Sequence, residues 1–280
     1  MTSETNDSPA RIRARRFDVD YGASPPSRHW AGEPFLTHWL NAYTITIPDG
    51  ENFIVQTIRK FLDQLQNPEV SRDALGLIGQ EISHARGHNQ FLAALRAQGF
   101  RLDTYLGFTR FISFKILQPT STPLQQLAFV VGIERVNELF AEITLSSGKL
   151  AAVEPPVRAL YEWHFAEEIE HKSVAFDVYQ AVSGSRFWLG YGVTLCYLVN
   201  MGYLFLGCAT FLRQDRQLFS WNTWKAAFRY FFVEEKFLPR MTRGCFQVLK
   251  RGFHPSHNDN LQLAEHVLRR RVINAQASQS

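Results

Sequence analysis

Two Glu-x-x-His units, Glu81-x-x-His84 and Glu168-x-x-His171, are the residues in this sequence most able to do chemistry. A spacing of three places both side chains of a unit on one side of a helix. Carboxylate oxygens and imidazole nitrogens together are typical ligands of transition metals. The two units therefore predict a metal site built from two helices.

Two other predicted helices each carry one further glutamate on their apolar stripe. These are Glu51 on the first helix and Glu134 on the third. Four carboxylates that converge on one core need compensating positive charge, because an isolated buried carboxylate is strongly disfavoured. Two metal ions supply that charge. One Glu from each of two helices and Glu-x-x-His from each of two others is the ligand scheme of ferritin-like carboxylate bundles. We therefore expect two Fe ions as cofactors, with Mn or Zn as alternatives.

A third histidine extends the second unit to His164-x3-Glu168-x2-His171, with all three side chains on one helical face. This extended unit resembles that of the di-iron arylamine N-oxygenases, and the resemblance implies that His164 is also a ligand. His88 and Glu138 share the stripes, and their roles as ligands or supporting groups stay open. The predicted metal ligands are Glu51, Glu81, His84, Glu134, His164, Glu168 and His171. Glu162, Glu167 and Glu170 are predicted to be surface charges.

Four long helical patterns position these residues and predict an all-α fold. They run from an Asp49 cap to about residue 66, from near Ser71 to Gly99, from a Thr122 cap to Gly148, and from near Pro156 to Gly184. The expected domain is a ferritin-like four-helix bundle over residues 17–184, preceded by a flexible basic tail over residues 1–16. Residues 100–121 form a longer connection, which is either a lid or a packed crossover.

Residues 185–280 are expected to form a hydrophobic and amphipathic helical appendage. Residues 187–212 carry no charge and are flanked by Arg186 and Arg213, so the segment is long enough to cross a bilayer. We expect membrane insertion on the cytoplasmic side. The alternative is a buried helix of a cytoplasmic protein, because Asn200 and several glycines lower the hydropathy. The segment from Trp221 onward is amphipathic and suits a membrane surface.

Composition excludes several classes of protein. The net charge of +4 is spread along the chain, so we expect no nucleic-acid partner. The three cysteines form no CxxC pair and no even framework, which argues against a disulfide scaffold and fits a reducing compartment. The N-terminus shows no signal-peptide pattern. A homodimer is compatible with the sequence, which does not decide the oligomeric state.

Short segments outside the ligands resemble a bacterial family of predicted metal-dependent hydrolases. They are Arg28-His29-Trp30, Thr37-His38-Trp39-Leu40-Asn41-Ala42, Ile47-Pro48-Asp49-Gly50-Glu51 and Gly252-Phe253-His254-Pro255. The resemblance covers most of the chain, and the two Glu-x-x-His units lie where that family has them. It implies a metal-dependent enzyme.

The preferred interpretation of the sequence is O2-dependent oxidation of a small apolar substrate by two Fe ions, with an unknown electron donor. Carboxylate oxygens favour oxidised iron, and imidazoles retain Lewis acidity. The first alternative is metal-assisted hydrolysis of an ester or phosphoester. The second is a non-catalytic bundle in which metal only stabilises the fold. Hydrolytic zinc sites usually have three protein ligands, which favours the oxidative interpretation of this larger set.

Overall fold

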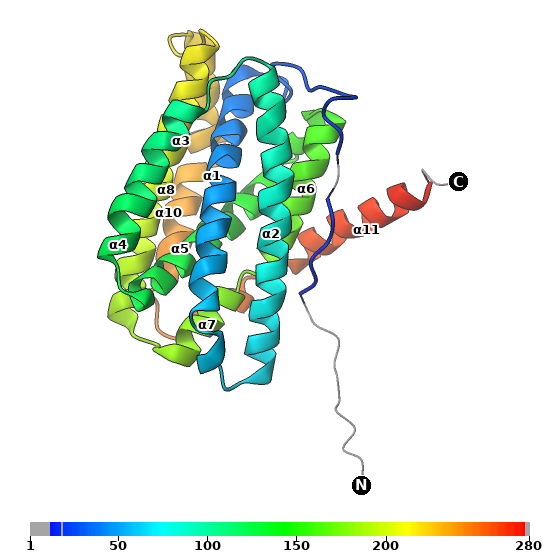
Figure 1. The fold of residues 1–280 in the computed structure, drawn as a ribbon. Helices are drawn as coiled ribbons and strands as arrows, with labels where there is room; N and C mark the ends of the chain where they lie inside the picture. The colour runs from blue at the N-terminus through cyan, green and yellow to red at the C-terminus, as the bar shows by residue number, and fades with distance from the viewer. Residues whose placement is uncertain (1–11, 18, 278–280) are drawn as a thin grey trace.

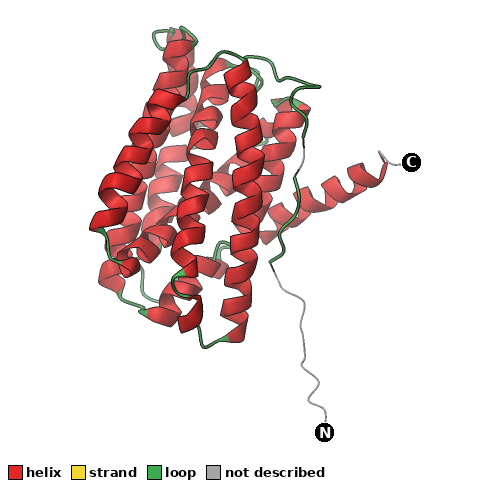
Figure 2. Ribbon diagram, viewed as in Figure 1, coloured by secondary structure: helices red, strands yellow, loops and turns green. Residues whose placement is uncertain are grey.

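The computed structural model describes residues 12–17 and 19–277, and these residues form helices and loops without a strand (Figure 2). The α-helices are α1 (Pro34–Arg59), α2 (Pro68–Ala97), α3 (Asp103–Arg110), α4 (Gln118–Thr120), α5 (Pro123–Ser146), α6 (Pro155–Glu170), α7 (Val174–Val182), α8 (Arg186–Gln214), α9 (Trp221–Phe228), α10 (Phe237–Gln247) and α11 (Leu261–Ala277). Short 3₁₀ segments are η1 (Leu62–Gln64), η3 (Lys149–Ala152) and η5 (Pro255–His257), and π-helical segments are η2 (Phe111–Leu117) and η4 (Arg229–Val233). The predicted all-α class is confirmed.

Helices α1, α2, α5 and the α6–α7 pair surround the predicted metal ligands (Figure 1). Helix α2 begins at a cap in which the Asn67 side chain accepts a hydrogen bond from the backbone of Glu69. Helix α5 begins with a capping box between Thr122 and Gln125. Both helices have proline at the first position, where its missing N–H is not needed. The Thr122 cap explains why the predicted range of α5 agrees closely with the structure, whereas α2 begins three residues before its predicted start near Ser71.

Helix α1 begins at Pro34, so the predicted start at Asp49 is wrong. The Glu33 side chain caps the helix by accepting hydrogen bonds from the backbone of Phe35 and Leu36 at 2.8 and 2.6 Å. Pro48 lies inside the helix. A proline inside a helix costs roughly 3 kcal/mol. Burial of apolar side chains on both sides of Pro48, among them Tyr43, Ile47 and Ile54, offsets this cost.

The fourth predicted helix is two helices. Helix α6 ends at Glu170, His171 is its C-cap, and α7 begins at Val174. The backbone N–H of Val174 donates to the carbonyl of His171 at 2.9 Å, which closes the turn between them. The break places His171 at a helix end rather than in mid-helix. Its side chain can therefore turn toward α2 and α5.

The connection between α2 and α5 is a packed crossover and not an open loop. It consists of α3, η2 and α4, which lie along the outside of α8 (Figure 1). The Tyr105 hydroxyl donates to the backbone carbonyl of Tyr203 on α8 at 2.7 Å. Tyr203 in turn donates to the carbonyl of Thr109 at 3.2 Å. Of the two alternatives for residues 100–121, the crossover fits these bonds.

Helix α8, the first part of the region expected to be an appendage, packs lengthwise on α1 and α5. Small residues allow this close approach. A side-chain carbon at Gly192 would lie 2.5 Å from Ala128, and one at Gly132 would lie 2.6 Å from Cys196. Within the described residues, α8 is also the helix that is long and apolar enough to cross a membrane. One face of α8 packs against α1 and α5, but only 39% of its most apolar stretch is buried, and Phe187, Leu198 and Leu206 are exposed.

Residues 12–17 lie against α2 and α6, although residues 1–16 were expected to be flexible. Ile12 is buried and its carbonyl packs close to Gly76, and Phe17 stacks on Trp163 with ring centres 4.8 Å apart. Burial of these apolar side chains stabilises the segment in place. The first part of the predicted tail, residues 1–11, lies outside the described residues.

The hydrophobic core has two parts along the bundle. One part is rich in aromatic side chains, including Trp39, Phe140 and Phe237. The other is mainly aliphatic and includes Ile54 and Leu77. The predicted metal ligands lie between the two parts, since on α1 Ile47 belongs to the first, Ile54 to the second, and Glu51 lies between them. The polar centre is thus closed off by apolar packing on both sides.

Candidate metal centre

The predicted ligands from four helices converge in the interior of the bundle, where each is almost fully buried. Two overlapping groups have donor atoms within 4.8 Å of one another: Glu51, His84, His164 and Glu168 form one, and Glu81, His84, Glu168 and His171 form the other. Glu168 is the carboxylate that the two groups share. A shared carboxylate between two adjacent donor groups is the arrangement that holds two ions side by side.

The donor atoms in the middle of this centre lack hydrogen-bond partners within the described residues. Both carboxylate oxygens of Glu51, Glu81 and Glu168 are buried without a partner, as are Nδ1 of His84 and Nε2 of His171. Buried polar groups are nearly always paired, since an unpaired one is strongly destabilising. A set of unpaired lone pairs that face one another fits a cation between them.

The charge balance of the centre leads to the same conclusion. Burial raises the pKa of Glu51 and Glu81 well above the usual range, and the neighbouring Glu168 carboxylate raises both further. Burial also raises the pKa of Glu134 and Glu168, although His171 opposes the shift for both. Carboxylates with raised pKa values are disfavoured in their charged form. Metal ions favour that form, so the residues present fit a site for divalent cations.

His84 is oriented by a carboxylate that the sequence analysis placed on the surface. Nε2 of His84 lies 3.0 Å from Oε2 of Glu167. With Nε2–H donating to Glu167, the lone pair of Nδ1 points toward Glu51 and Glu168, whose nearest oxygens are 3.6 and 3.7 Å away. A carboxylate that accepts from the second ring nitrogen fixes the tautomer of a metal-binding histidine and increases its basicity.

Glu167 is itself held in place and is buried, which corrects its prediction as a surface charge. The indole of Trp163 and the guanidinium of Arg15 donate to its Oε1 at 2.8 and 3.0 Å. Burial alone would raise the pKa of Glu167, but the hydrogen bonds from His84 and Arg15 outweigh it and lower the pKa. One signal was present in the sequence: Glu167 lies three residues after His164 and four before His171, hence on the same helical face. Glu162 and Glu170 are both only partly exposed, and Glu170 pairs with Arg15.

His171 and Glu134 form a second pair of this kind. Nδ1 of His171 lies 2.7 Å from Oε2 of Glu134, and its Nε2 faces Glu81 at 3.3 Å. Burial lowers the pKa of His171, but Glu134 and Glu168 outweigh it and raise the pKa to about 9. Glu134 belongs to neither donor group, although its Oε1 is unpaired. The structure therefore places Glu134 primarily as the orienting partner of His171.

His164 differs from His84 and His171 because both of its ring nitrogens have a hydrogen-bond partner. Its Nε2 lies 3.0 Å from the Tyr43 hydroxyl, and its Nδ1 lies 3.2 Å from Nε2 of His88. Burial lowers the pKa of His164 and His88 well below the usual value, so both rings are neutral. His88 is thus a neighbour of His164 and belongs to neither donor group.

Glu138, the alternative ligand on α5, points away from the centre. It is fully buried and pairs with Arg135 on the next turn. It also accepts hydrogen bonds from Asn258 and Asn260 at 2.9 and 3.2 Å. These bonds tie α5 to the chain that precedes α11. Glu138 is therefore not solvated, and it belongs to neither donor group.

A second polar cluster, missed by the sequence analysis, joins the end of α8 to the start of the bundle. Asp215 lies 2.5 Å from Nε2 of His29 and 3.0 Å from Nε2 of His38, and it also pairs with Arg28. Burial alone would raise the pKa of Asp215, but hydrogen bonds with His29, His38 and Arg28 outweigh it and lower the pKa to about 2. The Arg28 guanidinium already neutralises this carboxylate. The cluster is therefore a structural ion-pair network.

Comparison with known proteins gives one match. The family model described as predicted metal-dependent hydrolase matches residues 13–259, which include every residue of the centre. No curated protein and no solved structure matches the chain.

Proposed function

Since the chain belongs to the family of predicted metal-dependent hydrolases, we propose that its buried centre holds two divalent metal ions and hydrolyses an ester or phosphoester. The observation that carries this proposal is the convergence of unpaired donor atoms in two groups that share Glu168. The family description favours this reaction over the oxidation preferred from the sequence. The ferritin-like assignment of the bundle remains part of the proposal.

In this proposal the metal ions supply Lewis acidity and activate water at neutral pH. The protein orients them. Glu167 and Glu134 fix the ring positions of His84 and His171, and Glu168 links the two halves of the centre. Tyr43 borders the same interior, and burial raises its pKa well above the usual value, so its hydroxyl stays protonated and can donate a hydrogen bond. Apolar packing on both sides keeps bulk water away from the reacting group.

Oxidation by two Fe ions with O2 and an electron donor is the second candidate. The observation in its favour is the donor set, which has more carboxylates than hydrolytic zinc sites usually contain. Glu51 belongs to one donor group, Glu81 to the other and Glu168 to both. Glu134 adds a fourth carboxylate next to His171. Such a set suits iron in a higher oxidation state.

The two candidates are separated by the metal and gas that the reaction requires. Protein loaded with zinc or manganese should hydrolyse nitrophenyl esters or bis(nitrophenyl) phosphate without O2, whereas oxidation requires iron and O2. The matched control pair is Glu168→Ala, which removes the shared carboxylate, and Glu162→Ala, which lies on the same helix outside the centre. Hydrolysis lost only in Glu168→Ala supports the proposal. O2 consumption by the ferrous protein, with no hydrolysis under any metal, contradicts it.

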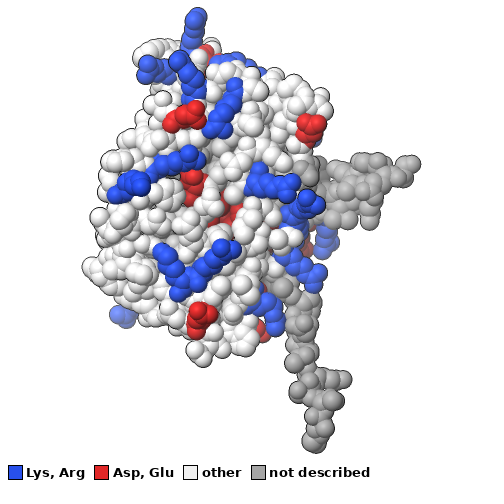
Figure 3. Space-filling view, viewed as in Figure 1, with Lys and Arg blue, Asp and Glu red and all other residues white. Residues whose placement is uncertain are grey.

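We further propose that the protein binds the surface of an anionic membrane and does not span it. Phe219, Trp221 and Phe228, around and within α9, are 95%, 79% and 60% exposed. Residues 186–251 contain only three acidic residues, Asp215, Glu234 and Glu235, among a clear excess of Lys and Arg. Basic side chains gather at the end of the molecule where α8 ends (top, Figure 3). Exposed aromatic side chains next to basic ones are typical of interfacial membrane binding.

Spanning is disfavoured because the inner face of α8 is already occupied by α1 and α5, and α1 carries the buried Glu51 toward the metal centre. Sedimentation with vesicles tests surface binding. The protein should bind vesicles that contain phosphatidylserine and not pure phosphatidylcholine, and the double change Phe219→Ser with Trp221→Ser should weaken binding. Leu75→Ser, an exposed leucine on α2, is the control. Absence of binding to either vesicle contradicts the proposal.

A further inference from the structure

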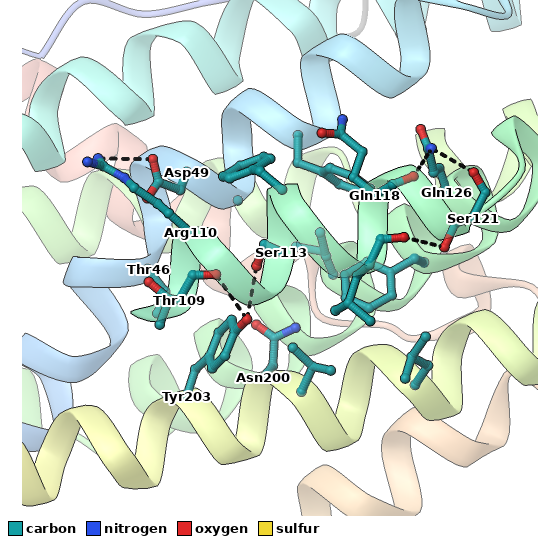
Figure 4. A pocket seen from close by; sticks show the side chains of 18 of the residues that line it. Thr46, Asp49, Thr109, Arg110, Ser113, Gln118, Ser121, Gln126, Asn200 and Tyr203 are labelled. Atoms are coloured by element: carbon teal, nitrogen blue, oxygen red, sulfur yellow. Dashed lines mark hydrogen bonds and ion pairs between the residues drawn. The ribbon is translucent and has the colours of Figure 1, made fainter. Parts of the chain in front are cut away.

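A pocket of about 780 Å³, the part open to solvent included, lies between α1, η2, α5 and α8 (Figure 4). Apolar side chains from all four elements line it, including Phe53, Phe114, Phe129 and Leu195. We call it the outer pocket.

Polar groups in the wall of the outer pocket use their hydrogen-bonding capacity on one another. Arg110, at the rim, pairs with Asp49 at 2.7 and 3.2 Å. The Tyr203 hydroxyl bonds to Ser113 at 3.0 Å, as Figure 4 shows. Gln126 donates to two backbone carbonyls and accepts from Lys60. The two charged residues in the lining, Asp49 and Arg110, thus neutralise each other, so the wall favours an uncharged, apolar occupant.

A smaller inner cavity lies between the outer pocket and the metal centre. Glu51 and Tyr43 line it on the side of the centre. Thr46, Ile133 and Asn200 line both the inner cavity and the outer pocket. The Glu51 carboxylate is 1% exposed, and neither of its oxygens has a hydrogen-bond partner. The two spaces therefore lie in series, and the inner one ends at an unpaired donor of the centre.

The wall formed by η2 is unusual in its backbone. Residues Phe111–Leu117 are π-helical, and three of them, Ser113, Phe114 and Leu117, line the outer pocket. The π-helix is rarely found in proteins and frequently occurs at functional sites. This wall is thus another indication that the space is a binding site.

We propose that the substrate is an uncharged molecule with a linear hydrocarbon chain, bound with its chain in the outer pocket and its reacting group in the inner cavity. Thr46, Ile133 and Asn200 form the constriction between the two. The assignment rests on the proposed function for the reaction at Glu51, but the binding of the chain does not. An ester of a long-chain acid or alcohol has this chemistry.

Filling the outer pocket tests the proposal. Gly50 lines the pocket, and a side-chain carbon placed there would meet no atom within 4 Å, so Gly50→Phe extends into open space. Gly202→Phe on α8 makes the same change at an equally open position outside the pocket lining. Val199→Phe fills the pocket from the opposite wall and is the second variant if Gly50→Phe does not fold. Metal content of each variant shows whether the centre is intact.

Binding to the metal-loaded full-length protein is measured with the neutral fluorophore N-phenylnaphthylamine and displacement by dodecanol or butanol. We expect Gly50→Phe to weaken binding by about tenfold, equivalent to roughly 1.4 kcal/mol, with no change in Gly202→Phe, and dodecanol to displace the fluorophore better than butanol. Equal binding by wild type and both pocket variants overturns the proposal, as does equal displacement by the two alcohols.

Activity separates this proposal from the proposed function. If wild type hydrolyses nitrophenyl laurate, Gly50→Phe should reduce that rate by about tenfold relative to nitrophenyl acetate. If no ester is hydrolysed with any metal but binding behaves as expected, the pocket assignment holds and the hydrolytic function is wrong. If Gly50→Phe lowers the hydrolysis rates of nitrophenyl laurate and nitrophenyl acetate equally while its metal content is unchanged, the hydrocarbon chain of the substrate does not occupy the outer pocket.

Discussion

The hydrogen bond between His84 and Glu167 provides a direct test of how the centre is built. Oε2 of Glu167 accepts from Nε2 of His84 at 3.0 Å, and no other carboxylate oxygen in the described residues forms a hydrogen bond with that ring. Loss of such an outer partner typically reduces metal affinity by about 10 to 100 fold. Glu167→Ala, which leaves the ring unsupported, should therefore weaken binding by roughly 1.4 to 2.7 kcal/mol. Glu167→Gln retains an acceptor oxygen but no charge, so its loss of metal affinity should lie near the lower end of this range.

Metal affinity is measured by competition with a chromophoric chelator, with zinc and manganese in turn. Glu162→Ala, on the same helix, is the control and should bind as wild type does. Circular dichroism of the metal-free variants separates a loss of affinity from a loss of fold. Wild-type affinity in Glu167→Ala would refute the reasoning, because Nδ1 of His84 would then need no orientation by Glu167.

Three further outcomes follow from the structure. Glu168→Ala should retain fewer than two metals per chain by elemental analysis, because both donor groups lose their shared carboxylate; retention of two contradicts this. Because the folded-state pKa of Asp215 is lowered to about 2 from 3.8, its ionised form stabilises the protein above about pH 4, and this contribution is lost as the pH falls toward 2. Asp215→Asn should thus lower the free energy of unfolding at pH 7 by about 1–3 kcal/mol and lose less stability between pH 4 and 2; identical urea denaturation profiles across this range would refute it. Gly192→Val should lower the melting temperature, because its side chain would lie 2.5 Å from Ala128 and overpacking costs about 1–3 kcal/mol. The control Gly202→Ala should leave the melting temperature unchanged. An unchanged melting temperature in Gly192→Val would mean that α8 does not pack against α5 at this position.

The parts of the fold that local signals determine could be predicted from the sequence. The Thr122-Pro123 cap begins α5 as expected. Helix α2 begins at the Asn67-Pro68 cap, three residues before the predicted start near Ser71. The start of α1 could not be predicted in this way. Pro48-Asp49-Gly50 has the local features of a helix start, but Trp39 and Tyr43 are buried upstream of it. Tertiary packing of the aromatic part of the core thus outweighs the local preference of Pro48.

The members of the candidate centre on one helix face were also predictable, because periodicity places Glu81 with His84 and Glu168 with His171. Their supporting partners were not. Arg15, which holds Glu167, is more than 150 residues distant in sequence. Likewise, no pattern joins Asp215 to His29 and His38, because α8 returns along the bundle to bring them together. Contacts between distant segments depend on packing that single-sequence periodicity does not contain.

The metal content of the wild-type protein shows directly whether the buried centre holds two ions. Full-length protein is made metal-free, reconstituted without O2 with iron, manganese or zinc, and analysed for bound metal per chain together with the Glu168→Ala variant. The account predicts close to two ions per chain in wild type with at least one of these metals, and a loss in the variant. Less than one ion per chain with all three metals, or equal metal content in wild type and Glu168→Ala, would contradict it.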